Sequence, residues 1–228
     1  KGHTVIGTGR RQEKLDELKT QLGDNFIPLN FDVSDLPATK TALQTLPNDV
    51  LNNLDVLVNN AGLALGLEPA DKTDFADWQQ MVNTNILGLI HLTHEILPFM
   101  VANNDGYIIN LSSTAGNYPY FGGNVYGATK AFVTQFSLNL RADLVGKNIR
   151  VSNIEPGLCG GTEFSNIRFH GDDAKAAQVY DSVQYVTPQD IANMVAWLIE
   201  QPKHVNINRI EVMPTAQTFA GLKVVKDL

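Results

Sequence analysis

The sequence predicts an α/β protein with a Rossmann-type, doubly wound parallel sheet and helices on both faces, in a three-layer αβα arrangement. Nearly continuous apolar segments of strand length alternate with segments whose apolar residues recur at helical spacing. Strands of that composition are typical of parallel sheets buried on both faces. Polar or glycine-containing stretches also follow five successive strands, which places them at the carboxyl edge, where open α/β sheets bind ligands.

The first half of the chain supplies three predicted strands and three predicted helices. The short run TVIG is typical of a strand, and Leu15, Leu18 and Leu22 then recur at helical spacing. The apolar runs FIPLNFDV and LDVLVNNAG are typical of buried strands. The predicted order is strand 3–8, helix 11–22, strand 26–33, helix 35–46, strand 54–58 and a long helix over about 74–101.

The second half repeats this alternation. The runs GYIINLSS and IRVSNIEPG are apolar and end in serines or in Pro-Gly, and NRIEVMP is the last strand-like run. The predicted order is strand 106–113, a long helix at 124–145, strand 149–157, helix 188–201 and strand 208–214. We expect residues 1–228 to form a single domain.

Composition excludes several classes of protein. With 228 residues and 43% apolar content, the chain is long enough to bury one core. The formal net charge of −7 argues against a nucleic-acid partner, and no uninterrupted apolar run reaches the roughly 18 residues of a membrane span. The single cysteine, Cys159, forms no internal disulfide and no CxxC pair, which predicts a cytoplasmic protein without a metal site.

The motif with the most chemical content is Tyr126-Gly-Ala-Thr-Lys130. A spacing of four residues puts the phenol and the ammonium on one face of a helix. A tyrosine with its ordinary pKa near ~10 is a poor base at neutral pH, and a nearby ammonium favours its phenolate. Ser113 lies thirteen residues before Tyr126 at a strand end, and Asn85 lies in the preceding long helix. Alone, the motif also fits an exposed aromatic residue beside a solvated lysine.

Five segments, LVNNAG, NTNILG, IINLSSTAG, YGATK and EPG, occur in the order and spacing of the short-chain dehydrogenase/reductase family, which the chain resembles over nearly its whole length. The resemblance implies a seven-stranded parallel sheet and a catalytic tetrad of Asn85, Ser113, Tyr126 and Lys130. In such a tetrad the tyrosine exchanges the substrate proton and the serine holds the substrate oxygen. The lysine lowers the tyrosine pKa and holds the nicotinamide ribose, and the asparagine holds a water of the proton relay. Family members pair through the two long helices, which implies a homotetramer.

The resemblance also implies that a first strand and its glycine-rich loop are not part of this sequence. Family members begin with a strand, a T-G-x-x-x-G-x-G loop and a helix, and only then reach the segment that opens here. No such glycine run occurs in the 228 residues. The first strand would lie between the strands at 3–8 and 54–58, so we expect these two strands not to pair with each other.

The implied cofactor is a nicotinamide dinucleotide, and the residues after strand 3–8 favour NADP. An acidic residue there would hold the free 2′-hydroxyl of NAD, whereas this sequence has Arg10 and Arg11. Cations are disfavoured at a helix N-terminus, so these arginines suit a 2′-phosphate held through forked hydrogen bonds; the alternative is two solvated charges. The implied cofactor contacts are Arg10, Arg11, Asp32, Val33, Asn59, Ala61, Gly62, Tyr126, Lys130, Pro156, Gly157 and Thr162.

Longer segments, among them STAGNYPYFGGNVYGATKAFV and EPGLCGGTEFSNIRFHGD, resemble the NADP-dependent 3-hydroxy acid dehydrogenases of the family. They imply oxidation of serine, allo-threonine or similar acids, or reduction of a semialdehyde. Ser113 and Arg168 are the implied substrate contacts. Arg168 would bind a carboxylate from a glycine-containing lid in the substrate-loop region 157–187, the alternative being a surface arginine.

Three other functions stay open at this point. The protein could reduce an uncharged carbonyl compound, bind nucleotide without catalysis, or carry out non-redox chemistry on nucleotide sugars. Loss of the tyrosine or the lysine would mark a non-catalytic member, and both Tyr126 and Lys130 are present. Relatives that act on nucleotide sugars usually have a larger region after the position of residue 157.

Overall fold

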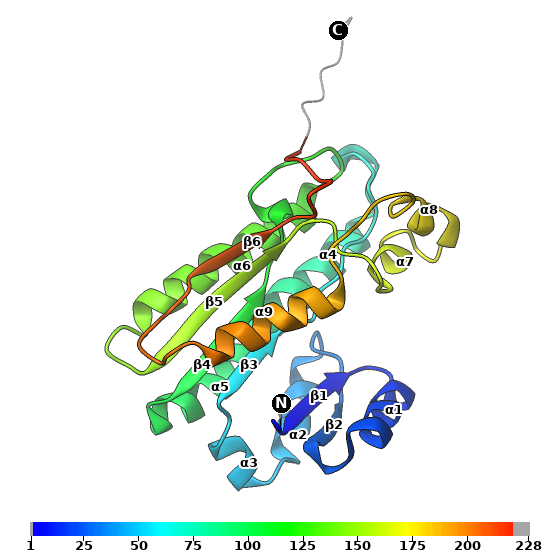
Figure 1. Cartoon of the computed structure of the whole chain (residues 1–228). Helices are drawn as coiled ribbons and strands as arrows, with labels where there is room; N and C mark the ends of the chain where they lie inside the picture. The colour runs from blue at the N-terminus through cyan, green and yellow to red at the C-terminus, as the bar shows by residue number, and fades with distance from the viewer. Residues whose placement is uncertain (1, 221–228) are drawn as a thin grey trace, which may run out of the picture.

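The computed structural model describes residues 2–220, whose strands form two parallel sheets (Figure 1). β1 (Val5–Gly9) pairs with β2 (Phe26–Asn30). The second sheet contains, in spatial order, β3 (Val56–Asn59), β4 (Gly106–Leu111), β5 (Ile149–Pro156) and β6 (Arg209–Val212). The predicted α/β class, the parallel strands and their alternation with helices are confirmed.

The sheet is divided between β1 and β3. These two strands do not pair with each other in the described part of the chain, as expected. Within residues 2–220, one sheet of two strands and one of four stand in place of the seven-stranded sheet that the resemblance implies. In this described part of the chain β1 and β3 each have an edge without a neighbouring strand, and each keeps an apolar side chain in solvent, since Val5 is 48% and Val58 is 39% exposed.

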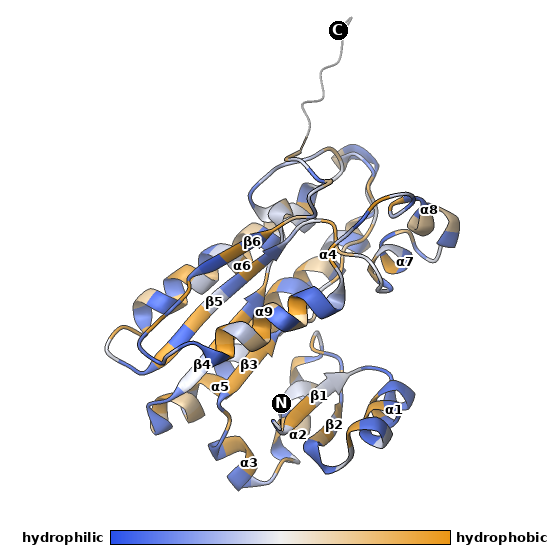
Figure 2. Ribbon diagram, in the orientation of Figure 1, coloured by the Kyte–Doolittle hydropathy of each residue, from blue (hydrophilic) through white to orange (hydrophobic). Residues whose placement is uncertain are grey.

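Helices cover both faces of the four-stranded sheet. α5 (Leu89–Asn103) and α6 (Asn124–Asp143) lie on one face, where their buried core includes Ile108 of β4. α9 (Pro188–Glu200) lies on the other face and packs against Tyr107 and Ile109 of the same strand. Successive side chains of a strand point to opposite faces, so β4 contributes to both cores. Figure 2 shows hydrophobic residues along β3 and on α9, beside the sheet.

The N-terminal part adds α1 (Gln12–Leu22), α2 (Leu36–Gln44) and the unpredicted short helix α3 (Asn48–Asn52). Leu29 and Phe31, at and beyond the end of β2, belong to the same buried cluster as Ile108. One hydrophobic core therefore joins the two sheets.

The long helix predicted at 74–101 runs from Phe75 to Asn103. It consists of α4 (Phe75–Val82), a π-helical turn at Asn83–Gly88 that contains Asn85, and α5. By length and composition alone this helix could cross a membrane, which is weak evidence because the core helix of a soluble protein passes the same test. Its residues Met81 and Met100 are completely buried, which fits a core helix.

The substrate-loop region is more regular than the glycine-containing lid that we predicted. It contains α7 (Phe164–Arg168) and α8 (Asp173–Gln178), which lie beside the upper end of the larger sheet in Figure 1. This arrangement places Arg168 near the carboxyl ends of the strands.

Candidate active site

The carboxyl ends of β4 and β5, with the loop after β3, surround a cavity of about 560 Å³. The start of α6 and the substrate-loop region complete its walls. The structure thereby brings together predicted site residues from five separate segments of the chain. Those that line the cavity are Gly62, Ser113, Tyr126, Lys130, Pro156, Gly157, Thr162 and Arg168.

Ser113 and Tyr126 line this cavity from neighbouring elements. Ser113 is the N-cap of the short 3₁₀ helix η4 (Thr114–Gly116); its Oγ accepts from the Ala115 N–H at 3.1 Å and donates to the Pro156 carbonyl at 3.2 Å. Burial raises the pKa of Tyr126 to about 12, although hydrogen bonding with Ser113 and the charge of Arg168 oppose the rise. The phenol therefore keeps its proton throughout the neutral range, and it is suited to donate that proton to a carbonyl oxygen.

Lys130 lies one turn after Tyr126 on α6 and is only 6% exposed. Its Nζ donates to the Leu111 carbonyl at 2.9 Å and lies 5.9 Å from the centre of the Tyr126 ring. Burial lowers the pKa of Lys130 to about 8. The Lys130 ammonium is directed at the Leu111 carbonyl, and the lowering of the tyrosine pKa by Lys130 stays a prediction. The charge of Arg168, whose guanidinium carbon lies 5.3 Å from the ring, opposes the rise that burial causes in the pKa of Tyr126.

Asn85 connects the loop after β3 to α6. Its Oδ1 accepts from the Leu63 N–H at 2.9 Å, and its Nδ2 donates to the Leu63 carbonyl at 2.8 Å and to Thr129 Oγ1 at 3.0 Å. Both amide protons of Asn85 are thus used in these hydrogen bonds. A relay water at this residue would therefore be held by a main-chain group of the π-helical turn and not by the side-chain amide. π-Helical turns of this kind are frequent at functional sites.

Six predicted cofactor residues do not line the cavity: Asn59, Ala61 and Val33, and also Arg10, Arg11 and Asp32. Asn59 is directed into the interior, where Nδ2 donates to Asn110 Oδ1 at 2.8 Å and to Thr93 Oγ1 at 3.0 Å. Its neighbour Asn60, which was not among the predicted cofactor contacts, lines the cavity instead. Ala61 is exposed, and Val33 lies so close to Gly88 that a Cβ on that glycine would come within 2.8 Å of the Val33 carbonyl oxygen. The pair Asn-Asn in the sequence does not say which amide faces inward; the alternation of side chains along β3 decides it.

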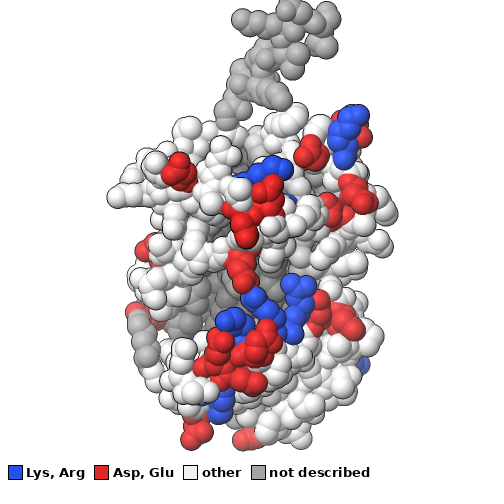
Figure 3. All heavy atoms as spheres, turned by 90° about the vertical axis from the view of Figure 1, so that its right-hand side faces the viewer, with Lys and Arg blue, Asp and Glu red and all other residues white. Residues whose placement is uncertain are grey.

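Arg10 and Arg11 are both paired with carboxylates. Arg10 Nη1 lies 3.6 Å from Asp32 Oδ2, and Arg11 forms a forked ion pair with Glu163 at 2.9 and 2.6 Å. Although partial burial raises it, hydrogen bonds from Ser34 and the charge of Arg10 leave the pKa of Asp32 below its ordinary value. Figure 3, which views the molecule from the right-hand side of Figure 1, shows Lys and Arg side chains gathered beside Asp and Glu side chains in its lower half. The two arginine side chains are 58% and 54% exposed, so an anionic ligand can reach them.

Arg168 lines the cavity and is held by two contacts. Its Nη2 donates to the Tyr120 hydroxyl at 2.5 Å, and its Nε donates to the Gly66 carbonyl at 3.3 Å. Tyr120 also lines the cavity but was not singled out from the sequence. The available signal was its place in the segment between Ser113 and Tyr126. The guanidinium is therefore an ordered cation beside the two predicted catalytic hydroxyls.

The residues present fit a nicotinamide dinucleotide. A Cβ at Gly62 would lie 3.2 Å from Lys130 Nζ and 3.4 Å from Asn85 Oδ1, so the glycine keeps space open beside both groups. The Lys130 ammonium is a donor suited to ribose hydroxyls, and the exposed arginines suit a phosphate. Within residues 2–220, no three His, Cys, Asp or Glu side chains are grouped as metal ligands.

The burial of Lys130 predicts a specific pH dependence of stability. Its pKa is lowered from 10.5 to about 8 in the folded protein, so below pH 8 the folded state contains a buried ammonium. Burying this charge reduces the free energy of unfolding, and the reduction disappears as pH rises toward 10.5. Lys130→Met removes that charge. We expect the free energy of unfolding of the wild type to gain roughly 2 to 3 kcal/mol relative to the variant between pH 8 and 10.5. Urea denaturation at both pH values measures the difference, and a constant difference would contradict the buried charge.

Comparison with known proteins places this site in a family. The family model for short chain dehydrogenase matches residues 1–172. A "Probable NADP-dependent dehydrogenase" of Haemophilus influenzae is 68% identical over 226 residues, which are 99% of this chain and 89% of that protein. The Escherichia coli protein "NADP-dependent 3-hydroxy acid dehydrogenase YdfG" is 56% identical over 223 residues, 98% of this chain and 90% of its own length.

A solved structure described as the closed form of serine dehydrogenase complexed with NADP+ is similar over 99% of this chain and 91% of its own. Its sequence is 56% identical, and the TM-score is 0.96. The family match covers most of the chain, and the shared fold extends over nearly all of it. This chain therefore belongs to the short-chain dehydrogenase family.

Proposed function

We propose that this chain is an NADP-dependent oxidoreductase that transfers a hydride between the cofactor and the hydroxyl-bearing or carbonyl carbon of a small 3-hydroxy acid. Serine and allo-threonine are the proposed acids, and the corresponding semialdehydes are the proposed substrates for reduction. The observation that carries this proposal is that Ser113, Tyr126 and Arg168 line one cavity. A carboxylate can pair with the guanidinium while the substrate oxygen lies at the two hydroxyls. The names of the similar proteins support the same class.

Bound NADP(H) supplies or accepts the hydride, and the residues of this chain orient the substrate and move its proton. Ser113 Oγ gives its hydrogen bond to the substrate oxygen in place of the Pro156 carbonyl, which stabilises charge on that oxygen. Tyr126 donates its phenolic proton to the oxygen during reduction and takes the hydroxyl proton during oxidation. Because the tyrosine pKa is about 12, the neutral phenol is ready for reduction at neutral pH.

Lys130, Asn85 and Arg168 support this proton transfer in the proposal. In this proposal Lys130 holds the ribose and lies beside Tyr126. Asn85 binds the main chain of Leu63 and so fixes the loop that contains Gly62 beside Lys130. A spectrophotometric assay of NADP+ reduction with a panel of hydroxy acids tests the function. Turnover of 3-hydroxy acids supports it. Activity confined to uncharged alcohols, or cofactor binding without turnover, would favour one of the alternatives.

Arg168 is the proposed partner of the substrate carboxylate. Arg168→Met keeps most of the side-chain length and removes the charge, so we expect kcat/KM for serine to fall roughly tenfold or more. An uncharged alcohol or aldehyde should lose far less. Steady-state kinetics on both substrates measure the difference. Equal losses would assign Arg168 to the cofactor or to the loop, where its bonds to Tyr120 and Gly66 already hold it.

The proposal includes a cytoplasmic homotetramer that forms through the helices α4, α5 and α6. Apolar side chains on these helices support such contacts: Phe75 is 71% exposed, and Phe132 is 37% exposed and stacks on Phe136. Light scattering on the purified protein measures the mass of the assembly, which distinguishes four subunits from one or two.

A further inference from the structure

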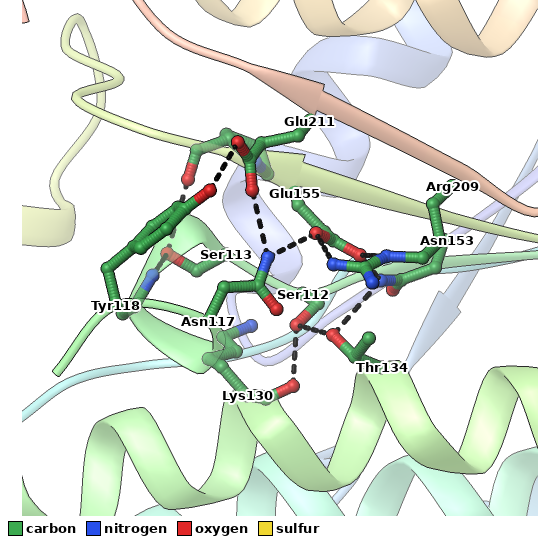
Figure 4. A network of polar contacts seen from close by, with 12 residues as sticks. Ser112, Ser113, Asn117, Tyr118, Lys130, Thr134, Asn153, Glu155, Arg209 and Glu211 are labelled. Atoms are coloured by element: carbon green, nitrogen blue, oxygen red, sulfur yellow. Dashed lines mark hydrogen bonds and ion pairs between the residues drawn. The ribbon is translucent and has the colours of Figure 1, made fainter. Parts of the chain in front are cut away.

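A second polar cluster lies beside Ser113, at the ends of β5 and β6 (Figure 4). Its centre is Glu155, which is 0% exposed and directly precedes Pro156, the residue whose carbonyl accepts from Ser113. The carboxylate accepts from Arg209 Nε and Nη2, both at 2.7 Å, and from Asn153 Nδ2 and Asn117 Nδ2, both at 2.6 Å. A buried carboxylate needs such an opposite charge and such donors to be tolerated.

A second carboxylate adjoins this one. Glu211 of β6 stands opposite Glu155 in the strand register. Like charges at opposing positions of neighbouring strands repel. Asn117 lies between them, donating one amide N–H to Glu155 Oε2 at 2.6 Å and the other to Glu211 Oε2 at 2.9 Å. Both protons of its amide are therefore used to bridge two anions, a task that neither an aspartate nor an aliphatic side chain can perform.

Asn117 directly follows η4, the short helix that Ser113 caps. The Asn117 N–H donates to the Thr114 carbonyl at 3.0 Å, and the Tyr118 hydroxyl donates to Glu211 Oε1 at 3.0 Å. The segment 113–118 is thus attached to β5 at both ends, through Ser113 Oγ on Pro156 and through Asn117 on Glu155. Asn117 is therefore one of three contacts, with Ser113 Oγ on Pro156 and the Tyr118 hydroxyl on Glu211, that hold this segment against β5 and β6.

The hydroxyl of Ser112, the neighbour of Ser113, is engaged in hydrogen bonds with α6 and is not available to a substrate. Ser112 Oγ donates to the Lys130 carbonyl at 2.6 Å and accepts from Thr134 Oγ1 at 2.9 Å. Its proton is committed to the main chain of α6, so Ser113 is the serine with a hydroxyl in the cavity wall that can turn to a substrate. Asn117 holds the other end of the short segment that begins with Ser113.

We propose that Asn117, held between Glu155 and Glu211, is a positioning residue that fixes η4 and thereby the Ser113 hydroxyl at the substrate oxygen. This inference rests on the proposed function for the reaction that Ser113 assists. Its geometric part rests on the contacts of residues 113–118 alone. A misplacement of about 1 Å at a reacting centre costs on the order of 10²-fold in rate.

Three variants of the full-length protein test the inference: Asn117→Ala, Asn117→Asp and the control Asn208→Ala. Asn208 directly precedes Arg209 at the amino end of β6, but its own side chain is outside the cluster around Glu155 and, among the described residues, accepts only from Asn206. We expect Asn117→Ala to lower kcat by roughly 10- to 100-fold, with NADP+ affinity within about twofold of wild type. The control should keep wild-type kinetics.

Asn117→Asp adds a pH signature that loss of stability alone would not produce. An ionised aspartate cannot donate to the two glutamates and repels both, so kcat relative to wild type should be lowest at pH 8 to 9. On protonation at lower pH the carboxyl regains one donor, and the ratio should rise toward that of Asn117→Ala. A flat ratio, or wild-type kcat in either variant, would overturn the inference.

A structural measurement separates this inference from the proposed function. If the wild type oxidises no 3-hydroxy acid, the proposed function fails, and crystal structures of wild type and Asn117→Ala then decide the positioning role. The inference expects Ser113 Oγ to leave the Pro156 carbonyl, 3.2 Å away here, in the variant only. An η4 that stays in place in the variant would overturn it.

Discussion

Tyr126→Phe lowers turnover by roughly 10²- to 10⁴-fold and leaves NADP(H) binding intact. The range is that of general acid–base catalysis by a positioned side chain. Only a hydroxyl is removed, and the ring keeps its packing against Phe164, whose centre lies 5.9 Å away, so the fold should tolerate the change. Steady-state kinetics in both directions and fluorescence titration with NADPH make the measurement.

The pH dependence of the wild type provides the matched control. Oxidation requires the phenolate, and the tyrosine pKa of about 12 means that this form increases with pH across the alkaline range. The oxidation rate should therefore rise with pH in the wild type, while the residual rate of Tyr126→Phe should lack that rise. A variant that keeps most of the wild-type rate, with the same pH profile, would show that another group handles the proton.

The sequence locates the site because parallel strands bring their carboxyl ends to one edge. Ser113 follows β4, Pro156 is the last residue of the adjacent strand β5, and Tyr126 lies on the helix between them in the chain. The order of elements is therefore enough to predict that these residues meet in one cavity. The four-residue spacing likewise predicts that Tyr126 and Lys130 share a face of α6. Periodicity and topology determine these contacts, and both are visible in the sequence.

Side-chain direction is the part that the sequence does not reveal. The flexible Lys130 side chain turns to the Leu111 carbonyl, and Asn59 turns inward while Asn60 lines the cavity. The pKa of Tyr126 follows from burial and from Arg168, which lies 42 residues away in sequence and arrives on α7. Such effects depend on tertiary packing, which local spacing does not encode.

The separation of β1 from β3 was predictable for a different reason. The family resemblance, with no glycine-rich loop among the 228 residues, predicted that these two strands would not be neighbours, and the divided sheet agrees with it. The ion pairs at the ends of β1 and β2 were not predictable. Glu163 comes from the substrate-loop region, 152 residues after its partner Arg11, and no pattern near either residue indicates the contact.

Replacing both arginines, Arg10→Gln with Arg11→Gln, shifts cofactor preference from NADP toward NAD. Two exposed guanidinium groups stand at the end of β1, where an acidic residue would select the 2′-hydroxyl of NAD. Loss of both charge-assisted contacts should weaken NADP+ binding on the order of 10²- to 10³-fold, and NAD+ binding should change little. Fluorescence titration with each cofactor gives the ratio of dissociation constants.

Glu163→Gln is the matched control for this double variant. Its carboxylate forms the forked pair with Arg11, and a 2′-phosphate at Arg11 must displace or share it. Neutralising Glu163 removes an anion beside the expected phosphate, so this variant should bind NADP+ more tightly and NAD+ unchanged, the opposite direction from the double variant. Because surface charges are screened by salt, both shifts should shrink as ionic strength rises. If the double variant keeps the wild-type ratio of dissociation constants, the 2′-phosphate is held elsewhere, and the ion pair of Arg11 with Glu163 only joins the end of β1 to the substrate-loop region.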